Sequence, residues 1–199
     1  MTTTDIAPAA ASGYPVRYDV AYPESLSRWL IFVKWLLGIP HFIILYALSS
    51  VFQALTLVAF FAILFTKKYP RGLFDFNVNI RRWQANVQAY VLLLRDEYPP
   101  FSLDAGQYAV TFEVDYPPEL SRWATLYKWL LAIPHYIVLL FLGIAALVVV
   151  IIAWFAILFT ATYPASLFNF VVGVQRWSER VNAYVLFMRD EYPPFSMEP

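Results

Sequence analysis

The two histidines of the chain, His41 and His135, are the residues whose type could support cofactor chemistry. Each follows a proline and precedes an aromatic residue, and the two lie 94 residues apart. Because imidazole ligates haem iron, one hypothesis is a haem or chlorin held between them at a pseudo-twofold axis. The alternative is a structural histidine that bonds a carbonyl freed by the proline or a lipid headgroup. No second ligand, metal-binding spacing or CxxCH motif accompanies either histidine, so the sequence favours this alternative.

Two acidic pairs, Asp96–Glu97 and Asp190–Glu191, are the most faithfully repeated charged residues, each inside the sequence RDEYPPFS. Such carboxylates could bind a cation or attract a basic partner, and we predict all four as partner-docking residues. The alternative is that they end a helix and pair with nearby arginine and lysine side chains, which is the commoner use of such clusters.

Recognised catalytic motifs are missing from the sequence. GxSxG, HExxH, P-loop and GxGxxG patterns do not occur, and the lack of cysteine removes thiolate ligands and cysteine nucleophiles. We therefore expect no catalytic residue, no metal site and no cofactor, and a protein that is not an enzyme.

The composition indicates a membrane protein. Of 199 residues, 60% are hydrophobic and 14% are charged, and the formal net charge is zero. Soluble domains carry about 25% charged residues. A nucleic-acid partner would require a clustered basic excess, which the balanced charge does not provide.

The chain consists of two copies of one unit. Residues 14–102 align without a gap on residues 108–196, and about half of the aligned positions are identical. We expect a flexible tail over residues 1–13, a short linker over residues 103–107, and two repeats that pack on each other as pseudo-symmetric halves.

Each repeat opens with alternating apolar and polar residues, over Val16–Tyr22 and Val110–Tyr116. A period of two predicts a half-buried strand, and the simplest partner for each strand is its counterpart in the other repeat. Ser27 and Ser121 follow these segments and are predicted as helix N-caps.

A long apolar run follows in each repeat, over residues 35–66 and from residue 129 onwards. About 32 residues at 1.5 Å each measure roughly 48 Å, more than one bilayer core and less than two. Each run therefore forms either one long span or a helical hairpin that turns near Ser49–Ser50 or Gly143. Basic residues flank the first run on both sides, which favours the hairpin because positive residues mark the cytoplasmic face.

Apolar residues then recur at steps of three and four over residues 73–94 and 167–188. This pattern predicts an amphipathic helix that lies on the membrane, because charges at a bilayer centre are costly. The alternative is a helix on the aqueous side that packs on the strands.

Basic and aromatic residues at the borders of these segments are predicted to contact lipid headgroups. They are Arg28, Trp29, Lys34, Trp35, Arg82, Trp83, Arg122, Trp123, Lys128, Trp129, Arg176 and Trp177.

The ordered motifs RW, KWLL-[GA]-IPH, AILFT, RW and RDEYPPF occur in both repeats. This set resembles a bacterial membrane family known only as a domain of unknown function, number 4389 in that series, whose members often carry the unit in tandem. The resemblance covers residues 14–196 and implies an integral membrane protein of bacterial origin, with no catalytic residue.

From these observations we expect a mainly α-helical integral membrane protein of the bacterial cytoplasmic membrane, with its N-terminus in the cytoplasm. Its expected function is that of a non-enzymatic accessory or scaffold subunit that organises lipid or docks a partner complex. Its expected partners are membrane lipids and other membrane subunits or a second copy of itself, without nucleic acid. The alternative function is a cofactor-carrying or small-solute transport protein that uses the paired histidines.

Overall fold

The structure is a computed structural model and describes residues 13–199. Of the predicted tail over residues 1–13, all but Gly13 lies outside the described residues. The elements are β1 (Val16–Val20), a short 3-10 helix η1 (Leu30–Phe32), α1 (Lys34–Leu37), α2 (Ile39–Thr66), α3 (Arg71–Val91), β2 (Val110–Val114), α4 (Arg122–Leu131), α5 (Ile133–Thr160) and α6 (Ala165–Val185).

The two strands form one antiparallel ribbon that joins the repeats. Tyr18 lies opposite Phe112, which is its counterpart in the other repeat, and Val16 lies opposite Val114. The register is therefore centred on equivalent residues. This confirms the prediction that each strand pairs with its counterpart.

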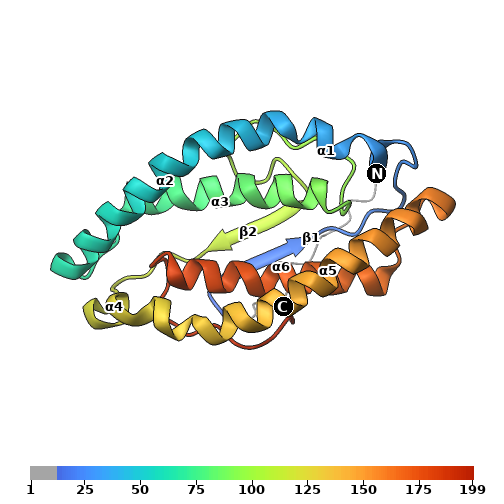
Figure 1. Ribbon diagram of the computed structural model, residues 1–199. Helices are drawn as coiled ribbons and strands as arrows, with labels where there is room; N and C mark the ends of the chain where they lie inside the picture. The colour runs from blue at the N-terminus through green and yellow to red at the C-terminus, as the bar shows by residue number, and fades with distance from the viewer. Residues whose placement is uncertain (1–12) are drawn as a thin grey trace, which may run out of the picture.

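The elements lie side by side in the order α2, α3, β2, β1, α6, α5, as Figure 1 shows. Each strand contacts a helix of the other repeat, since β1 packs on α6 and β2 packs on α3. Each long helix also contacts the other repeat, because α2 contacts α4 and α5 contacts η1. The two repeats consequently share a single hydrophobic core.

The long apolar runs do not form hairpins. Each contains one unbroken helix of 28 residues, so the hairpin prediction is wrong and the single-helix alternative is right. The expected turn residues fit inside a helix. The Ser49 hydroxyl donates to the carbonyl of Tyr46, one turn earlier. Gly143 lies on an open part of α5, where a glycine costs only about 1 kcal/mol relative to alanine.

The helices predicted to lie on the membrane are instead internal. Helix α3 packs between α2 and β2, and α6 packs between α5 and β1, so each is covered on two sides. The apolar stripe meets the protein core, as with Phe74 and Phe168. The prediction of an interfacial helix is therefore wrong, and the alternative of a helix packed on the strands is right.

The predicted serine caps differ between the repeats. Ser121 is the N-cap of α4, and its hydroxyl accepts from the amide of Ala124 at 3.3 Å. Ser27 accepts from the amide of Leu30 at the same distance, but the segment that follows is the 3-10 helix η1. The first repeat thus breaks into η1 and α1 where the second forms the continuous helix α4.

Candidate membrane surface and histidine clusters

Helices α2 and α5 present most of their apolar side chains outwards. Both are long and apolar enough to cross a membrane, and only 11% of each apolar window is buried. Each touches the body of the protein along a narrow stripe, formed by His41, Leu45, Ala59 and Ile63 in α2 and by His135, Ala146, Ala153 and Ile157 in α5. Apolar patches of this extent are not stable in water and indicate contact with lipid or another protein.

Four of the predicted lipid-facing tryptophans are exposed and lie in the segments that immediately precede α2 and α5. The exposed fractions are 80% for Trp29, 62% for Trp35, 75% for Trp123 and 62% for Trp129. Arg28 and Arg122 are exposed beside them. These positions match an interfacial role, because an indole places its apolar ring and its N–H at different depths of a headgroup layer.

The prediction of lipid contact is wrong for the other six residues, whose side chains are buried or half-buried in the protein. They are Lys34, Lys128, Trp83, Trp177, Arg176 and the half-buried Arg82. In each case a group distant in sequence bonds to the polar atoms of the side chain, although one terminal nitrogen of Arg82 makes no hydrogen bond to the described residues. Arg176, for example, donates to the carbonyls of Tyr18 and Met197, both at 2.8 Å.

His41 is fully buried in an aromatic cluster at the start of α2. Trp83 Nε1 of α3 donates to His41 Nδ1 at 3.1 Å. The ring of Phe101 stacks on the imidazole with 4.0 Å between centroids, and Tyr98 lies against it at 4.9 Å. The histidine therefore fastens α2 to α3 and to the segment that follows α3.

The second repeat builds the same cluster around His135. Trp177 Nε1 donates to His135 Nδ1 at 3.0 Å, and Phe195 stacks on the imidazole at 4.0 Å. The two histidines lie in separate clusters of their own repeats, and neither contacts the other's aromatic partners. The tryptophan and phenylalanine partners were not predicted from the sequence, although each recurs at the same spacing in both repeats.

The hydrogen bond from tryptophan fixes the tautomer of each histidine. Because indole N–H is only a donor, Nδ1 must be the unprotonated acceptor, and the ring proton of the neutral imidazole sits on Nε2. A haem or metal ligand needs a free lone pair on the nitrogen that coordinates. Ligation through Nε2 would require a proton on Nδ1 and the loss of the tryptophan bond.

This arrangement leads to a testable expectation for both histidines. Nitrogen-15 spectra of histidine-labelled protein at neutral pH should show two neutral rings with the proton on Nε2, and Trp83→Phe should release this preference for His41 alone. Addition of haem to the purified protein should not give the absorption spectrum of a histidine-ligated haem. A proton on Nδ1, or a haem spectrum lost on His41→Ala with His135→Ala, would revive the cofactor hypothesis.

Near the start of each long helix, the aspartate of an acidic pair forms a salt bridge with a buried lysine. Lys34 Nζ, 1% exposed, lies 2.7 Å from Asp96 Oδ1 and donates to the Arg95 carbonyl at 2.6 Å. Lys128 makes the same contacts with Asp190 and Arg189. Within the described residues these two aspartates therefore serve the fold, as the alternative interpretation expected.

The neighbouring glutamates pair with the arginine of the same motif. Arg95 pairs with Glu97, and Arg189 pairs with Glu191. Burial by itself raises the pKa of Glu97 and Glu191, but the arginine hydrogen bond, a backbone hydrogen bond and the arginine charge together outweigh it, and the net pKa is lowered. Both glutamates stay at least half exposed, so a docking role for them remains a prediction.

Charged groups also occupy the middles of the two internal helices. Arg81 of α3 lies 2.6 Å from Glu179 of α6, whose side chain is 2% exposed. Arg82 donates to the Phe112 carbonyl at 3.2 Å, and Arg176 pairs with Asp19 of β1 at 2.9 Å. A few charged side chains of α3, α6 and the ribbon therefore lie beside the hydrophobic core.

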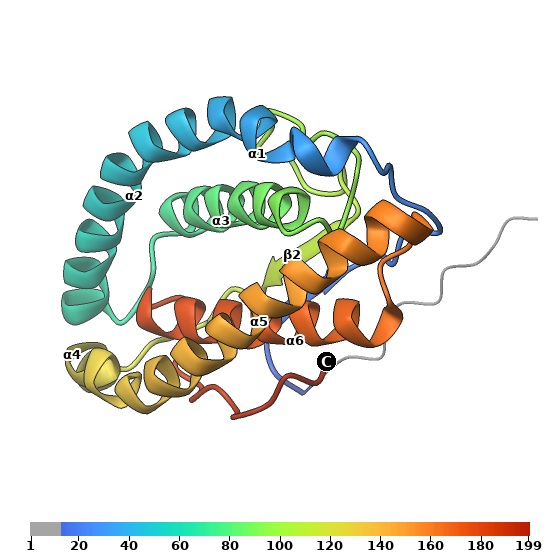
Figure 2. The same ribbon diagram turned by 45° about the vertical axis from the view of Figure 1, so that its right-hand side comes forward.

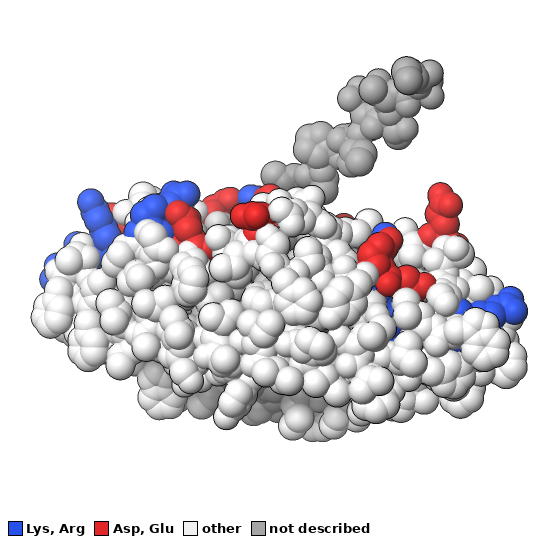
Figure 3. All heavy atoms as spheres, turned by 90° about the horizontal axis from the view of Figure 1, so that it is seen from above, with Lys and Arg blue, Asp and Glu red and all other residues white. Residues whose placement is uncertain are grey.

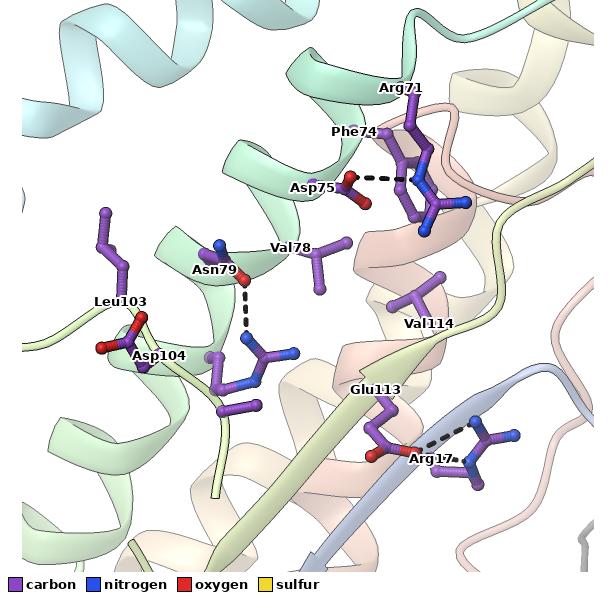
Figure 4. A pocket seen from close by; sticks show the side chains of 12 residues that line it. Arg17, Arg71, Phe74, Asp75, Val78, Asn79, Leu103, Asp104, Glu113 and Val114 are labelled. Atoms are coloured by element: carbon purple, nitrogen blue, oxygen red, sulfur yellow. Dashed lines mark hydrogen bonds and ion pairs between the residues drawn. The ribbon is translucent and has the colours of Figure 1, made fainter. Parts of the chain in front are cut away.

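A cavity of about 470 Å³ opens between α3 and the β2 side of the ribbon. Figure 4 shows Asn79 and Asp75 on α3 facing Glu113 and Val114 of β2, with Asp104 of the linker at one end. Three arginines, Arg17, Arg71 and Arg82, complete its polar lining.

A protein family described as "Domain of unknown function (DUF4389)" matches the chain twice, over residues 28–102 and 122–197. The two matched segments fall within the two repeats. No curated protein and no solved structure matches the chain.

Proposed function

Because the chain belongs to the DUF4389 family, a family without an assigned activity, we propose its function from its own surfaces. The proposed function is that of a non-enzymatic membrane module, an accessory or scaffold subunit of the bacterial cytoplasmic membrane. Helices α2 and α5 bind lipid, and the charged side of the molecule, on the cytoplasmic side, docks a partner. The observation that carries the proposal is the exposed apolar surface of these two helices.

The distribution of charge supports a particular orientation. In the view of Figure 3, lysine, arginine, aspartate and glutamate side chains gather along one edge of the molecule, and the opposite edge is free of them. The long helix α5 passes in front of α6 in Figures 1 and 2, so the two helices lie at different depths. We propose that α2 and α5 lie flat within one leaflet, with the charged side in water.

An upright orientation would be costly. Helix α3 runs back beside α2, so an upright α2 would carry Arg81 and Arg82, at the middle of α3, to the bilayer centre. Each charge there costs about 3 kcal/mol or more. The open edges of a two-stranded ribbon would also lose hydrogen bonds to water.

The helix length agrees with this argument. Each long helix measures about 42 Å, whereas the hydrocarbon core is about 30 Å thick. An upright helix would need a tilt of roughly 45°, beyond the usual range of 0–40°. A helix about 10 Å wide that lies flat fits within one leaflet.

The cysteine-free sequence allows a direct test in oriented membrane vesicles. Ser25→Cys precedes the first long helix and Lys68→Cys follows it, and both positions are exposed. The flat orientation predicts that an impermeant maleimide labels both variants in the same vesicle type. Ser50→Cys, carrying a nitroxide near the middle of α2, should lie no deeper than the helix ends.

The outcomes separate the two parts of the proposal. Labelling of Ser25→Cys and Lys68→Cys from opposite sides contradicts the flat orientation and leaves membrane binding intact. A protein that stays in the supernatant of sedimented membranes, or leaves them on a carbonate wash, contradicts the membrane module itself.

A further inference from the structure

From the comparison of the two repeats, we infer that the cavity beside Arg82 binds a small oxyanion, a phosphate or a carboxylate. Arg82 and Arg176 occupy equivalent positions on α3 and α6. The second repeat shows which groups satisfy this arginine when the protein supplies them. The first repeat leaves the corresponding donors facing the cavity.

In the second repeat, each of the three nitrogens of the Arg176 guanidinium makes a hydrogen bond. Its Nε donates to the carbonyl of Tyr18, one terminal nitrogen donates to the Met197 carbonyl at 2.8 Å, and the other pairs with Asp19 Oδ1 at 2.9 Å. The chain after the second repeat thus lies over this arginine. A carboxylate and a carbonyl therefore bind its two terminal nitrogens.

In the first repeat, two of these groups are absent from the guanidinium of Arg82. Its Nε donates to the Phe112 carbonyl, which corresponds to that of Tyr18, and one terminal nitrogen donates to Asn79 Oδ1 at 2.6 Å. Within residues 13–199, no carboxylate lies at ion-pair distance, and no hydrogen bond is made by the remaining terminal nitrogen. Arg82 is therefore held in place with an unpaired donor edge towards the cavity.

Two substitutions between the repeats cause the difference. Glu113 corresponds to Asp19 but pairs with Arg17 across the ribbon at 3.1 Å, whereas the counterpart of Arg17 is Thr111. Asn79 replaces Gly173, where the chain packs so closely that a Cβ would lie 2.8 Å from that of Met197. Arg17 therefore holds the Glu113 carboxylate away from Arg82. The Asn79 side chain takes the place that the backbone at Met197 takes in the second repeat.

The unpaired N–H groups of Arg82 favour an oxyanion as the ligand. A guanidinium presents its N–H groups in a plane that matches the oxygens of a carboxylate or a phosphate, and such charge-assisted bonds are the strongest of their kind. Three carboxylates line the cavity, and two of them are paired, Glu113 with Arg17 and Asp75 with Arg71. Asp104 is the third and would compete with a ligand. It accepts from Ser102 Oγ at 3.1 Å and from Gln107 Nε2 at 3.3 Å, away from Arg82.

Calorimetric titration of the detergent-purified full chain with inorganic phosphate, and separately with succinate, tests the inference at low ionic strength. We expect saturable binding of at least one of them. Arg82→Gln should weaken it at least tenfold, and Asp104→Asn should strengthen it. Arg28→Gln is the matched control, since it removes an exposed arginine outside the cavity and should change the affinity less than threefold.

Arg17→Thr provides the most specific test, because it leaves Arg82 unchanged and copies the second repeat. It should release Glu113 to pair with Arg82 and so weaken anion binding at least tenfold. A titration with short-chain phosphatidic acid shows whether a lipid headgroup competes for the same site. Absence of saturable binding for all three anions, or binding that Arg82→Gln does not change, overturns the inference.

Discussion

Residues 14–102 expressed alone will not fold as a monomer. The inner face of β1, formed by Val16, Tyr18 and Val20, is at most 3% exposed in the whole chain and packs on α6 of the second repeat. Burial of one such side chain contributes about 1.5–3 kcal/mol, so its loss for three removes roughly 5 kcal/mol or more. That amount approaches the whole stability of many domains.

Light scattering of the detergent-solubilised single repeat should therefore show aggregates or a dimer. A dimer is feasible because Tyr18 already faces its own counterpart in the ribbon, so two copies can pair in the same register. The matched control is the chain divided within residues 103–107, whose two halves should copurify when coexpressed. A monomeric single repeat with cooperative unfolding would contradict the shared core.

Asp190→Asn will destabilise the protein by about 3 kcal/mol, because it leaves Lys128 charged and buried without its partner. Lys128 is fully buried, and its ammonium lies 2.7 Å from Asp190 and 5.1 Å from the centre of the Tyr184 ring. Lys128→Met should cost less, since it removes the charge and retains the apolar stem. Denaturation in detergent, followed by circular dichroism, measures both losses.

The pH dependence separates the charge from the packing. Burial lowers the pKa of Lys128, and Asp190 opposes this effect in the native chain. Between the lowered folded pKa and the unfolded value of about 10.4, the unfolded state binds more protons, so stability rises with pH. The deficit of Asp190→Asn should shrink between pH 7 and pH 10, whereas that of Lys128→Met should grow, because the native chain gains stability over this range and the methionine variant does not. A deficit independent of pH would contradict the buried charge.

The sequence was sufficient for features that depend on local pattern. The alternation around Tyr18 and Phe112 predicted the strands, and the repeat predicted their pairing. It was insufficient for the long helices, because a serine pair or a single glycine is as compatible with a helix as with a turn. The continuity of α2 depends on the packing of Ala59 and Ile63 against the core, which local pattern does not contain.

The site was harder to predict because its partners are distant in sequence. Lys34 was expected among lipid headgroups, yet its partner Asp96 lies 62 residues later and the side chain is buried. One signal was present, since Lys128 and Asp190 repeat the same spacing. When a lysine and an aspartate recur together at a fixed separation, the recurrence favours an internal ion pair over two unrelated surface charges.

The exchange of strands between the repeats also sets the order in which the chain can finish its structure during synthesis. Tyr18 leaves the ribosome 158 residues before Arg176, whose guanidinium binds its carbonyl. At about 5–20 residues per second, this delay lasts roughly 8–30 s. Throughout it, the first strand lacks its helix, and a neighbouring nascent chain can offer the same strand. Crowded translation on one message therefore favours interchain pairing, and slow initiation protects against it.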